Sequence, residues 1–516
     1  MPPDSAAPRP DPAASGQSAG GQSPAGLTPA EVRSVIWGSM LALFLSALDQ
    51  TIVATALPAI SRDLGDIQLI GWVITAYLLT STSATPILGK LSDQLGRRVV
   101  VHLCLAIFLL GSVLCALAPT MLTLVLARAL QGVGGGGLIT MSQALVADVV
   151  SPRERGRYSG IISAVWAAAA VLGPTLGGFL TQYLSWPWIF WINLPLGLVA
   201  FLVIDRQLRR LHLSRRKARI DYPAILLFVL VTTAFLLALS WAGVPGRLWT
   251  METVVAAAIF LVGGTLLVFH QRVAAEPILP PRFLSDRVVG PLLAAIFLIF
   301  GSYLASTVLM PTYLQVALGA SPDQTGLLMI PMMVSGTVSA WRAGVYATKT
   351  GRYKGPPLYS IPVSIAAMIA LGFLAPQLTP FEAAMLFMVV GLGLGPIFPM
   401  TMIAAQNAVQ RHDLGAVSGS VGFSRALGGA VGTAAASALV LGLLARRLAG
   451  HLESLDELTR RVLNAAERLA VAETFSVLFY ATAAVLALGL LLFARVEVRE
   501  LKGERPSVAR AKKPRD

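Results

Sequence analysis

A ten-residue segment and a second segment that resembles it indicate how this 516-residue chain is organised. The stretch reads Gly89-Lys90-Leu91-Ser92-Asp93-Gln94-Leu95-Gly96-Arg97-Arg98. The chain reads Gly344-Val345-Tyr346-Ala347-Thr348-Lys349-Thr350-Gly351-Arg352-Tyr353-Lys354 at an offset of 255 residues. In both segments two glycines stand seven apart and a basic cluster follows. The match predicts that one half of the chain repeats the other.

A second set of glycines supports the same repeat. Gly156, Gly160 and Gly173 match Gly415, Gly419 and Gly432 at an offset of 259. Chance spacing among 47 glycines is the weaker explanation, because spacing and position relative to apolar segments agree together. Parallel repeats with a binding site at their interface are a known transporter architecture.

The apolar segments around these motifs are long enough to cross a bilayer. Each runs for about 20 residues, and a hydrocarbon core of ~30 Å requires that length. Because lipid offers the backbone no hydrogen bonds, each should be a helix. Hydrophobic residues make up 55% of the chain, charged residues only 13%, and mean hydropathy is +0.71. We place fourteen spans at 35–57, 70–91, 99–117, 120–145, 157–181, 188–205, 222–241, 251–270, 289–315, 323–347, 356–375, 380–404, 417–443 and 473–494.

The predicted fold is therefore an all-α integral membrane protein with two pseudo-symmetric six-helix bundles and two inserted helices. We expect a disordered cytosolic tail at 1–33 and an N-terminal bundle at 34–207. A basic linker and the inserted helices occupy 208–275, and the C-terminal bundle occupies 276–495. An amphipathic outer loop is expected at 444–472 and a basic cytosolic tail at 496–516.

The distribution of basic residues predicts the orientation of the chain in the membrane. The tails and even-numbered turns hold 30 of the 40 Lys and Arg residues, the opposite loops hold 7, and three lie within spans. By the positive-inside rule both termini are cytoplasmic. The net charge of +14 follows from this topology and does not indicate nucleic-acid binding.

The chain lacks the residues that several classes of function require. The two cysteines, Cys104 and Cys115, share one predicted span, so we expect no disulfide framework and no metal site. All five histidines fall in loops or near helix ends, and no stretch outside the spans is long enough for a signalling domain. We also expect no cleaved signal peptide. We expect neither an enzyme nor a receptor, no catalytic residue and no cofactor.

The stretch at 89–98 has a local interpretation. Gly89 and Gly96 allow a tight turn and close helix approach. Asp93 supplies a carboxylate that a helix N-terminus or a guanidinium can hold. Arg97 and Arg98 keep the loop in the cytosol. The second copy has Thr348 in place of the aspartate, so only one half carries the charge.

Asp49 is the only acidic residue deep in any predicted span. A lone charge at mid-membrane costs several kcal/mol and marks a functional or paired site. Asp49 and Arg128 each lie about 8 residues from the outer end of their spans, roughly 12 Å deep at 1.5 Å per residue. They are level, so a direct or water-mediated pair is feasible. Such a pair is either structural or a carboxylate that exchanges a proton.

The fifth predicted span contains Gly173-Pro174-Thr175-Leu176-Gly177-Gly178. Proline in a membrane helix removes a backbone hydrogen bond, and glycines permit close packing. Taken alone, this motif is weak evidence for any function. Its position among the other motifs along the chain makes that evidence stronger.

The order and spacing of these motifs along the chain resemble the fourteen-span drug:proton antiporter family of the major facilitator superfamily. Three further segments contribute to the resemblance, at residues 72–77, 186–195 and 406–432. The resemblance covers about residues 35–495. It implies that 89–98 is a cytoplasmic gating loop, that Asp49 and Arg128 couple to protons, and that Gly173, Pro174, Gly177 and Gly178 form the antiporter motif of exporters. Residues 167–170 and Pro187 depart from the family pattern.

The resemblance also suggests a substrate cavity, for which we select Gln50, Tyr77, Gln131 and Arg425. Arg425 lies about 10 residues into its span with no carboxylate at its depth. It either bonds to polar groups such as Gln406 or Asn407, or it faces a cavity and favours an anionic substrate.

The expected function is proton-coupled multidrug efflux by alternating access, exporting lipophilic, often cationic compounds in exchange for protons. The alternative is a dedicated exporter of one metabolite, lipid or antibiotic. The expected location is a bacterial cytoplasmic membrane. The expected partners are the lipid bilayer, a small-molecule substrate and protons, with no nucleic acid, and the protein should act as a monomer driven by the proton gradient.

Overall fold

A computed structural model describes residues 28–66, 69–151, 154–209, 221–242, 249–274, 277–278, 280–447 and 464–501. Within these ranges the chain forms helices joined by turns, and no strand is present. The predicted basic linker, the two tails and the outer loop at 444–472 fall wholly or largely outside the described residues.

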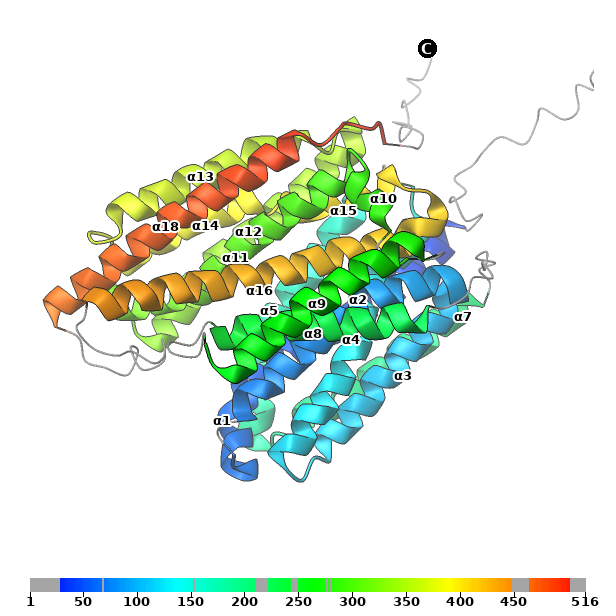
Figure 1. Ribbon diagram of the computed structural model, residues 1–516, viewed down its shortest axis with the longest axis horizontal. Coiled ribbons are helices and arrows are strands. Elements are labelled where there is room, and N and C mark those ends of the chain that lie inside the picture. Colours follow the sequence, from blue (N-terminus) through cyan, green and yellow to red (C-terminus); the bar gives the residue numbers. More distant parts are fainter. Residues whose placement is uncertain are drawn as a thin grey trace, which may run out of the picture.

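The first group of helices packs mainly with itself and lies along the lower side of Figure 1. Its main contacts join α2 to α4, α3 to α4 and α1 to α5. The group comprises α1 (Pro29–Leu64), α2 (Ile70–Leu95), α3 (Arg97–Ala116), α4 (Met121–Val149), α5 (Arg155–Tyr183), α6 (Trp188–Trp191) and α7 (Asn193–Leu208).

A helical pair follows, α8 (Tyr222–Ala242) and α9 (Met251–Val273). The two pack against each other, and α8 also contacts α2 and α16. The ring of Phe228 lies 5.2 Å from that of Phe423 on α16. The pair therefore lies beside the line where the two larger groups meet (Figure 1).

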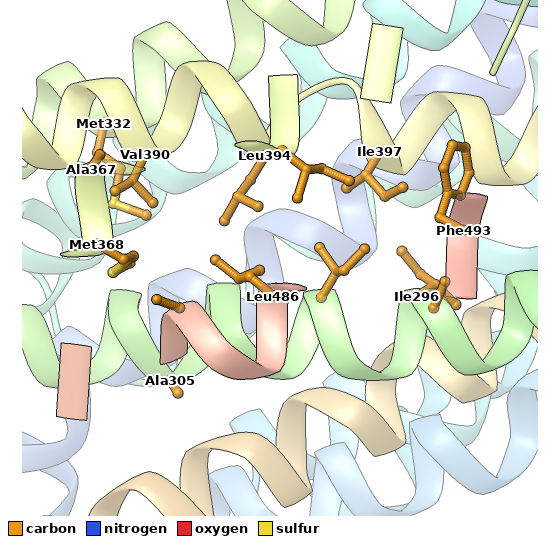
Figure 2. Packing of buried hydrophobic residues seen from close by; sticks show 14 of the residues in the cluster. Ile296, Ala305, Met332, Ala367, Met368, Val390, Leu394, Ile397, Leu486 and Phe493 are labelled. Atoms are coloured by element: carbon orange, nitrogen blue, oxygen red, sulfur yellow. The ribbon is translucent and has the colours of Figure 1, made fainter. Parts of the chain in front are cut away.

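The second group holds the largest apolar core. In Figure 2 side chains from α11, α13, α14, α15 and α18, including Ile296, Met368, Leu394 and Leu486, interdigitate. The group comprises α10 (Pro281–Ser285), α11 (Val289–Thr312), the π-helix η3 (Tyr313–Ala317), α12 (Pro322–Thr350), α13 (Gly355–Leu374), α14 (Pro380–Leu394), α15 (Ile397–Ala408), the 3-10 turn η4 (Arg411–Asp413), α16 (Leu414–Arg447) and α18 (Ala465–Ala494).

Twelve candidate membrane spans occur in the described residues, each a helical stretch long and apolar enough to cross a bilayer. Three of them join consecutive elements: α6 with α7, α11 with η3, and α14 with α15. The predicted spans at 70–91 and 323–347 are helical as α2 and α12, but these helices are not among the twelve. Both carry many hydroxyl side chains and lie where the two groups meet.

Helix ends differ from the predicted boundaries for local reasons. Helix α1 begins at Pro29, inside the predicted tail at 1–33, because Thr28 and Glu31 form a reciprocal capping box. The predicted sixth span is broken at Ile192 between α6 and α7. Helix α18 begins at Ala465, with Asn464 as its cap, so the end of the predicted outer loop is helical.

The two groups meet along two helix pairs, α2 with α16 and α5 with α12. Close backbone approach occurs where glycine is present. A Cβ at Gly89 would lie 2.4 Å from the Gly415 carbonyl oxygen, and one at Gly419 would lie 2.8 Å from the Cα of Pro86.

The prediction of a loop at 89–98 is wrong: residues 89–95 end α2, Arg97 and Arg98 begin α3, and only Gly96 between them is not helical. We call the end of the molecule that carries this segment the loop end. There the groups are in contact, and Figure 1 shows their helices diverging away from it.

Candidate functional site

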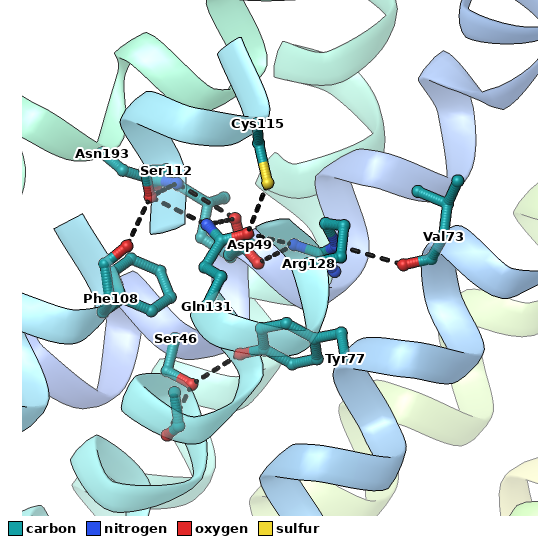
Figure 3. Close-up of polar contacts among 12 residues, drawn as sticks. Ser46, Asp49, Val73, Tyr77, Phe108, Ser112, Cys115, Arg128, Gln131 and Asn193 are labelled. Carbon is teal, nitrogen blue, oxygen red and sulfur yellow. Dashed lines mark hydrogen bonds and ion pairs between the residues drawn. The ribbon is translucent and has the colours of Figure 1, made fainter. Parts of the chain in front are cut away.

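An ion pair is buried inside the first helical group. Arg128 on α4 approaches Asp49 on α1 with an Nη1 to Oδ2 distance of 2.6 Å. The two side chains are 1% and 0% exposed. Figure 3 shows them facing each other among α1, α2, α3 and α4. The direct pair is thus present, as the equal depth of the two residues in their predicted spans allowed. Its part in proton coupling stays a prediction.

Both oxygens of the Asp49 carboxylate accept hydrogen bonds. The Nε2 of Gln131 donates to Oδ1 at 2.8 Å, and the Nδ2 of Asn193 on α7 donates to the same atom at 3.0 Å. With the guanidinium on Oδ2, three donors converge on one carboxylate. Charge-assisted hydrogen bonds of this kind stabilise an ionised group away from water. The observed arrangement therefore suits the deprotonated form.

Arg128 has partners besides the carboxylate. Its Nε donates to the carbonyl of Val73 at 3.1 Å, and its Nη1 donates to Oε1 of Gln131 at 2.7 Å. Its guanidinium carbon lies 4.2 Å from the centre of the Tyr77 ring, a cation–π contact. The Tyr77 hydroxyl in turn lies 3.2 Å from Ser46 Oγ and within reach of Gln50. The predicted residues Asp49, Arg128, Gln131 and Tyr77 thus form one cluster, with Gln50 at its edge.

The glycine-rich part of α4 makes this cluster geometrically feasible. A Cβ at Gly132 would lie 2.4 Å from the carbonyl oxygen of Tyr77, and one at Gly135 would lie 2.1 Å from the Tyr77 hydroxyl. On the opposite side, Gly134 lies against Phe108 of α3. Because these positions lack side chains, α2 and α3 both pack directly on α4.

The glycine–proline motif at residues 173–178 lies against the same stretch of α1. A Cβ at Gly173 would lie 2.0 Å from Thr51 Oγ1, and one at Gly177 would lie 2.6 Å from the Ile52 carbonyl oxygen. The Thr51 hydroxyl donates to the Ala169 carbonyl at 2.8 Å, which ties α1 to α5. A Cβ at Gly178 would meet no described atom within 4 Å. Two of the three motif glycines therefore have a packing reason, and they face the turn of α1 that follows Asp49.

The 89–98 segment, at the junction of α2 and α3, connects the two groups at the loop end. Asp93 accepts hydrogen bonds from the backbone N–H groups of Gly415 and Ala416, at 3.1 and 2.8 Å. These groups begin α16, where the helix dipole favours an anion. Asp93 also pairs with Arg97 at 2.7 Å, and Arg97 pairs with Asp148 at 2.8 Å.

The remaining residues of this segment have separate roles. Arg98 pairs with Asp205 on α7 at 2.8 Å. Gly96 ends α2 with a φ of 93°, a conformation that favours glycine. Asp93 lies beyond residue 91, the predicted end of its span. Burial raises the pKa of its carboxyl to about 6, while Arg97 and the two backbone donors act in the opposite direction.

Arg425 lies apart from this cluster, on α16 in the second group. Its guanidinium carbon is 5.5 Å from the centre of the Phe300 ring. The two polar partners suggested for it bond elsewhere: Gln406 donates to Ser418, and Asn407 donates to backbone carbonyls of Arg499 and Glu500. That these four residues line one cavity therefore stays a prediction: Gln50, Tyr77 and Gln131 belong to the first helical group, and Arg425 belongs to the second.

Sequence reasoning missed three members of the buried cluster. Ser112 Oγ accepts from Gln131 and Asn193, at 2.8 and 3.2 Å, and Cys115 Sγ donates to Gln131 Oε1 at 3.5 Å. Asn193 was visible as an amide within an apolar span, which must find partners there. The side chains it would meet could not be inferred, because that depends on which faces of α3 and α7 point inward.

The features together define the class of protein. Many helices long enough to cross a bilayer surround buried charged and amide side chains, which is typical of multi-pass membrane transporters.

The chain belongs to the Major Facilitator Superfamily, whose sequence model matches residues 39–433. It is 34% identical over 426 residues to "Multidrug transporter protein MdtP" of Bacillus subtilis, covering 82% of this chain and 78% of that protein. It is 35% identical over 427 residues to an uncharacterized MFS-type transporter of Mycobacterium tuberculosis. That match covers 82% of this chain but 61% of the relative.

Solved structures of other transporters share the fold. The human organic anion transporter MFSD10 (TETRAN) superposes with a TM-score of 0.61 at 17% identity, covering 90% of this chain and 100% of that one. A bacterial homologue of ferroportin in an outward-facing state gives a TM-score of 0.63 at 14% identity, covering 90% and 98%. At these identities the likeness concerns the fold alone.

Proposed function

We propose that this chain is a proton-coupled efflux antiporter that exports small lipophilic compounds by alternating access. The observation that carries the proposal is the fully buried carboxylate of Asp49, held by one guanidinium and two amides. Support comes also from relatives named as a multidrug transporter and as efflux pumps, among them "Efflux pump FUS6" of Gibberella fujikuroi at 34% identity.

We further propose fourteen spans in a bacterial cytoplasmic membrane, with both termini cytoplasmic and the monomer as the working unit. In this arrangement α2 and α12 cross the bilayer as well. Their hydroxyl-rich sequences fit helices that line the meeting surface of two halves, since many hydroxyls donate to the carbonyl of their own helix. The inserted pair α8 and α9 lies beside that surface.

The proposed cycle uses the partners of Arg128. When Asp49 takes up a proton from the outer side, its attraction to the guanidinium falls. Arg128 keeps the Val73 carbonyl, the Gln131 oxygen and the Tyr77 ring, so its charge is still compensated. The tie between α1 and α4 weakens, and the helices that pack on α1 become free to shift. Release of the proton to the cytosol restores the pair.

The test is Asp49→Asn in purified protein reconstituted into liposomes with an imposed pH gradient. We expect loss of gradient-driven efflux, because an amide cannot carry the exchanged proton. The retained carbonyl oxygen still accepts a hydrogen bond, so insertion and folding should survive. The matched control is Asp66→Asn, an exposed residue at positive φ, which asparagine tolerates. Efflux equal to wild type in Asp49→Asn would remove this carboxylate from the mechanism.

The second candidate function is a dedicated exporter of one metabolite, lipid or antibiotic. Arg425, which has no carboxylate beside it among the described residues, favours this candidate, because export of a broad range of lipophilic cations does not call for a guanidinium deep in the second helical group. A transport panel of cations, neutral drugs and anions separates the two candidates.

A further inference from the structure

Arg425 lies near the middle of the membrane on the proposed topology. It is 11 residues beyond Leu414, the first residue of α16, which is about 16 Å along the helix axis. That is close to half of a ~30 Å hydrocarbon core. The side chain is partly buried, and a guanidinium at this depth is costly unless something compensates its charge.

The described part of the second helical group supplies no counter-ion. Among its carboxylates, those in ion pairs have other partners: Asp286 pairs with Arg499, Asp413 with Arg282, and Glu473 with Arg447. Glu382 and Glu467 cap the helices they begin, and Glu497 and Glu500 follow the end of α18. In the first group, Asp49 forms an ion pair with Arg128.

The Phe300 ring beside the guanidinium belongs to a cluster of three aromatic side chains. Phe300 and Tyr303 on α11 and Phe398 on α15 form a closed triad, with ring centres 5.3 to 5.7 Å apart. All three side chains are partly exposed, as is Arg425. Gly429, one turn beyond Arg425, leaves space for Phe300, since a Cβ there would lie 3.2 Å from its ring.

We propose that Arg425 and the triad of Phe300, Tyr303 and Phe398 form a substrate subsite for an organic anion. The guanidinium fork would bind a carboxylate or a similar oxyanion, and the rings would pack on an apolar or aromatic body. The substrate then provides the negative charge that the described part of this half lacks beside Arg425. This inference rests on the proposed export function and names its substrate class.

The subsite has an electrical consequence. Exchange of one exported anion for one imported proton moves two positive charges inward per cycle. An interior-negative membrane potential would therefore drive transport in addition to the pH gradient. Export of a monovalent cation for one proton would move no net charge.

The test compares two dyes of similar shape and opposite charge, fluorescein as the anion and pyronin Y as the cation. Equilibrium binding to the purified full-length protein is followed by fluorescence anisotropy without any gradient. The wild type should bind fluorescein more tightly. Arg425→Gln should weaken fluorescein binding about tenfold or more, which is the effect of one charge-assisted contact, and should not weaken pyronin binding. Arg425→Lys, which keeps the charge and loses the fork, should fall between.

The matched control is Arg342→Gln, which removes an exposed guanidinium from α12 and should leave both affinities unchanged. Phe300→Leu should weaken both dyes, because it removes the stacking surface. The subsite is overturned if wild type prefers pyronin, or if Arg425→Gln and Arg425→Lys bind fluorescein as the wild type does.

Failure of the subsite and failure of antiport give different results. If fluorescein affinity depends on Arg425 but a pH gradient moves neither dye, antiport fails and the subsite stands. If the gradient drives pyronin export while Arg425 variants bind both dyes normally, the subsite fails and antiport stands.

Discussion

At the scale of single residues, Arg128 organises the buried cluster. It contacts α1 through Asp49, α2 through the Val73 carbonyl and the Tyr77 ring, and its own helix through Gln131. Depth arithmetic on two helices could predict the level of the pair. It could not predict Asn193 or Ser112, since these enter from α7 and α3, whose rotation is fixed by packing and not by a local sequence pattern.

Arg128→Ala should strongly destabilise the protein. The change leaves the Asp49 carboxylate buried without its cation, and removing one partner of a buried pair costs about 3–5 kcal/mol. The double variant Arg128→Ala with Asp49→Asn should recover part of the loss, because no unpaired charge remains. Thermal unfolding in detergent measures both. Arg209→Ala is the control, since its side chain is 67% exposed and such pairs contribute at most about 1 kcal/mol. Equal unfolding temperatures for Arg128→Ala and the control would contradict the assignment.

At the scale of helices, glycine decides which pairs approach closely. The sequence marked Gly173, Gly177 and Gly178 as one motif, but only the first two face α1. Their four-residue spacing places them on one helix face, and Gly178 lies about 100° away from Gly177. The motif could be recognised in the sequence, whereas its partner helix required the structure. The predicted sixth span is divided by a turn at Ile192, and twelve candidate spans occur in the described residues, so the count of fourteen stays a proposal.

Gly177→Ala and Gly178→Ala form a matched pair in this helix. The first places a methyl group 2.3 Å from Thr55 Oγ1 and 2.6 Å from the Ile52 carbonyl oxygen, so it should destabilise by about 1–3 kcal/mol. The second meets nothing within 4 Å and should be neutral or stabilising by up to about 1 kcal/mol, because alanine is the better helix former. Thermal unfolding compares them. Similar losses for both substitutions would show that the α1–α5 contact does not depend on this face.

At the scale of the whole molecule, the two groups are joined at the loop end through Asp93 and the first turn of α16. The internal repeat predicted two halves, and the described helices pack in two main groups. The sequence did not show that the Asp93 carboxylate would bind the start of α16. Gly415 was noted for its spacing, and its backbone N–H has no signature in the side-chain pattern.

The loop end should close more firmly at lower pH. In the closed arrangement the pKa of Asp93 is about 6, with Arg97, Asp148 and the N–H groups of Gly415 and Ala416 facing it. When the halves separate and water reaches the carboxyl, its pKa should return toward the ordinary value near 4. The closed form then binds the proton more tightly, so acidification from pH 7 to 5 favours closure.

Spin labels on cysteines introduced at Glu154 and Lys349, exposed near the loop end of α5 and α12, measure this closure as a distance distribution. The short-distance population should grow as the pH falls, and Asp93→Asn should remove the pH dependence. A short-distance population that shrinks on acidification would contradict the expected direction.

The native thiols bear on how such reagents can be used. Cys104 and Cys115 are both 0% exposed; a Cβ at Gly137 would touch the sulfur of the first, and the second donates to Gln131. Maleimides and methanethiosulfonates cannot reach either sulfur while the helices stay packed. Labelling chemistry can therefore be directed to engineered sites on the natural background, and modification of Cys115 would report that the interior around Asp49 has become accessible.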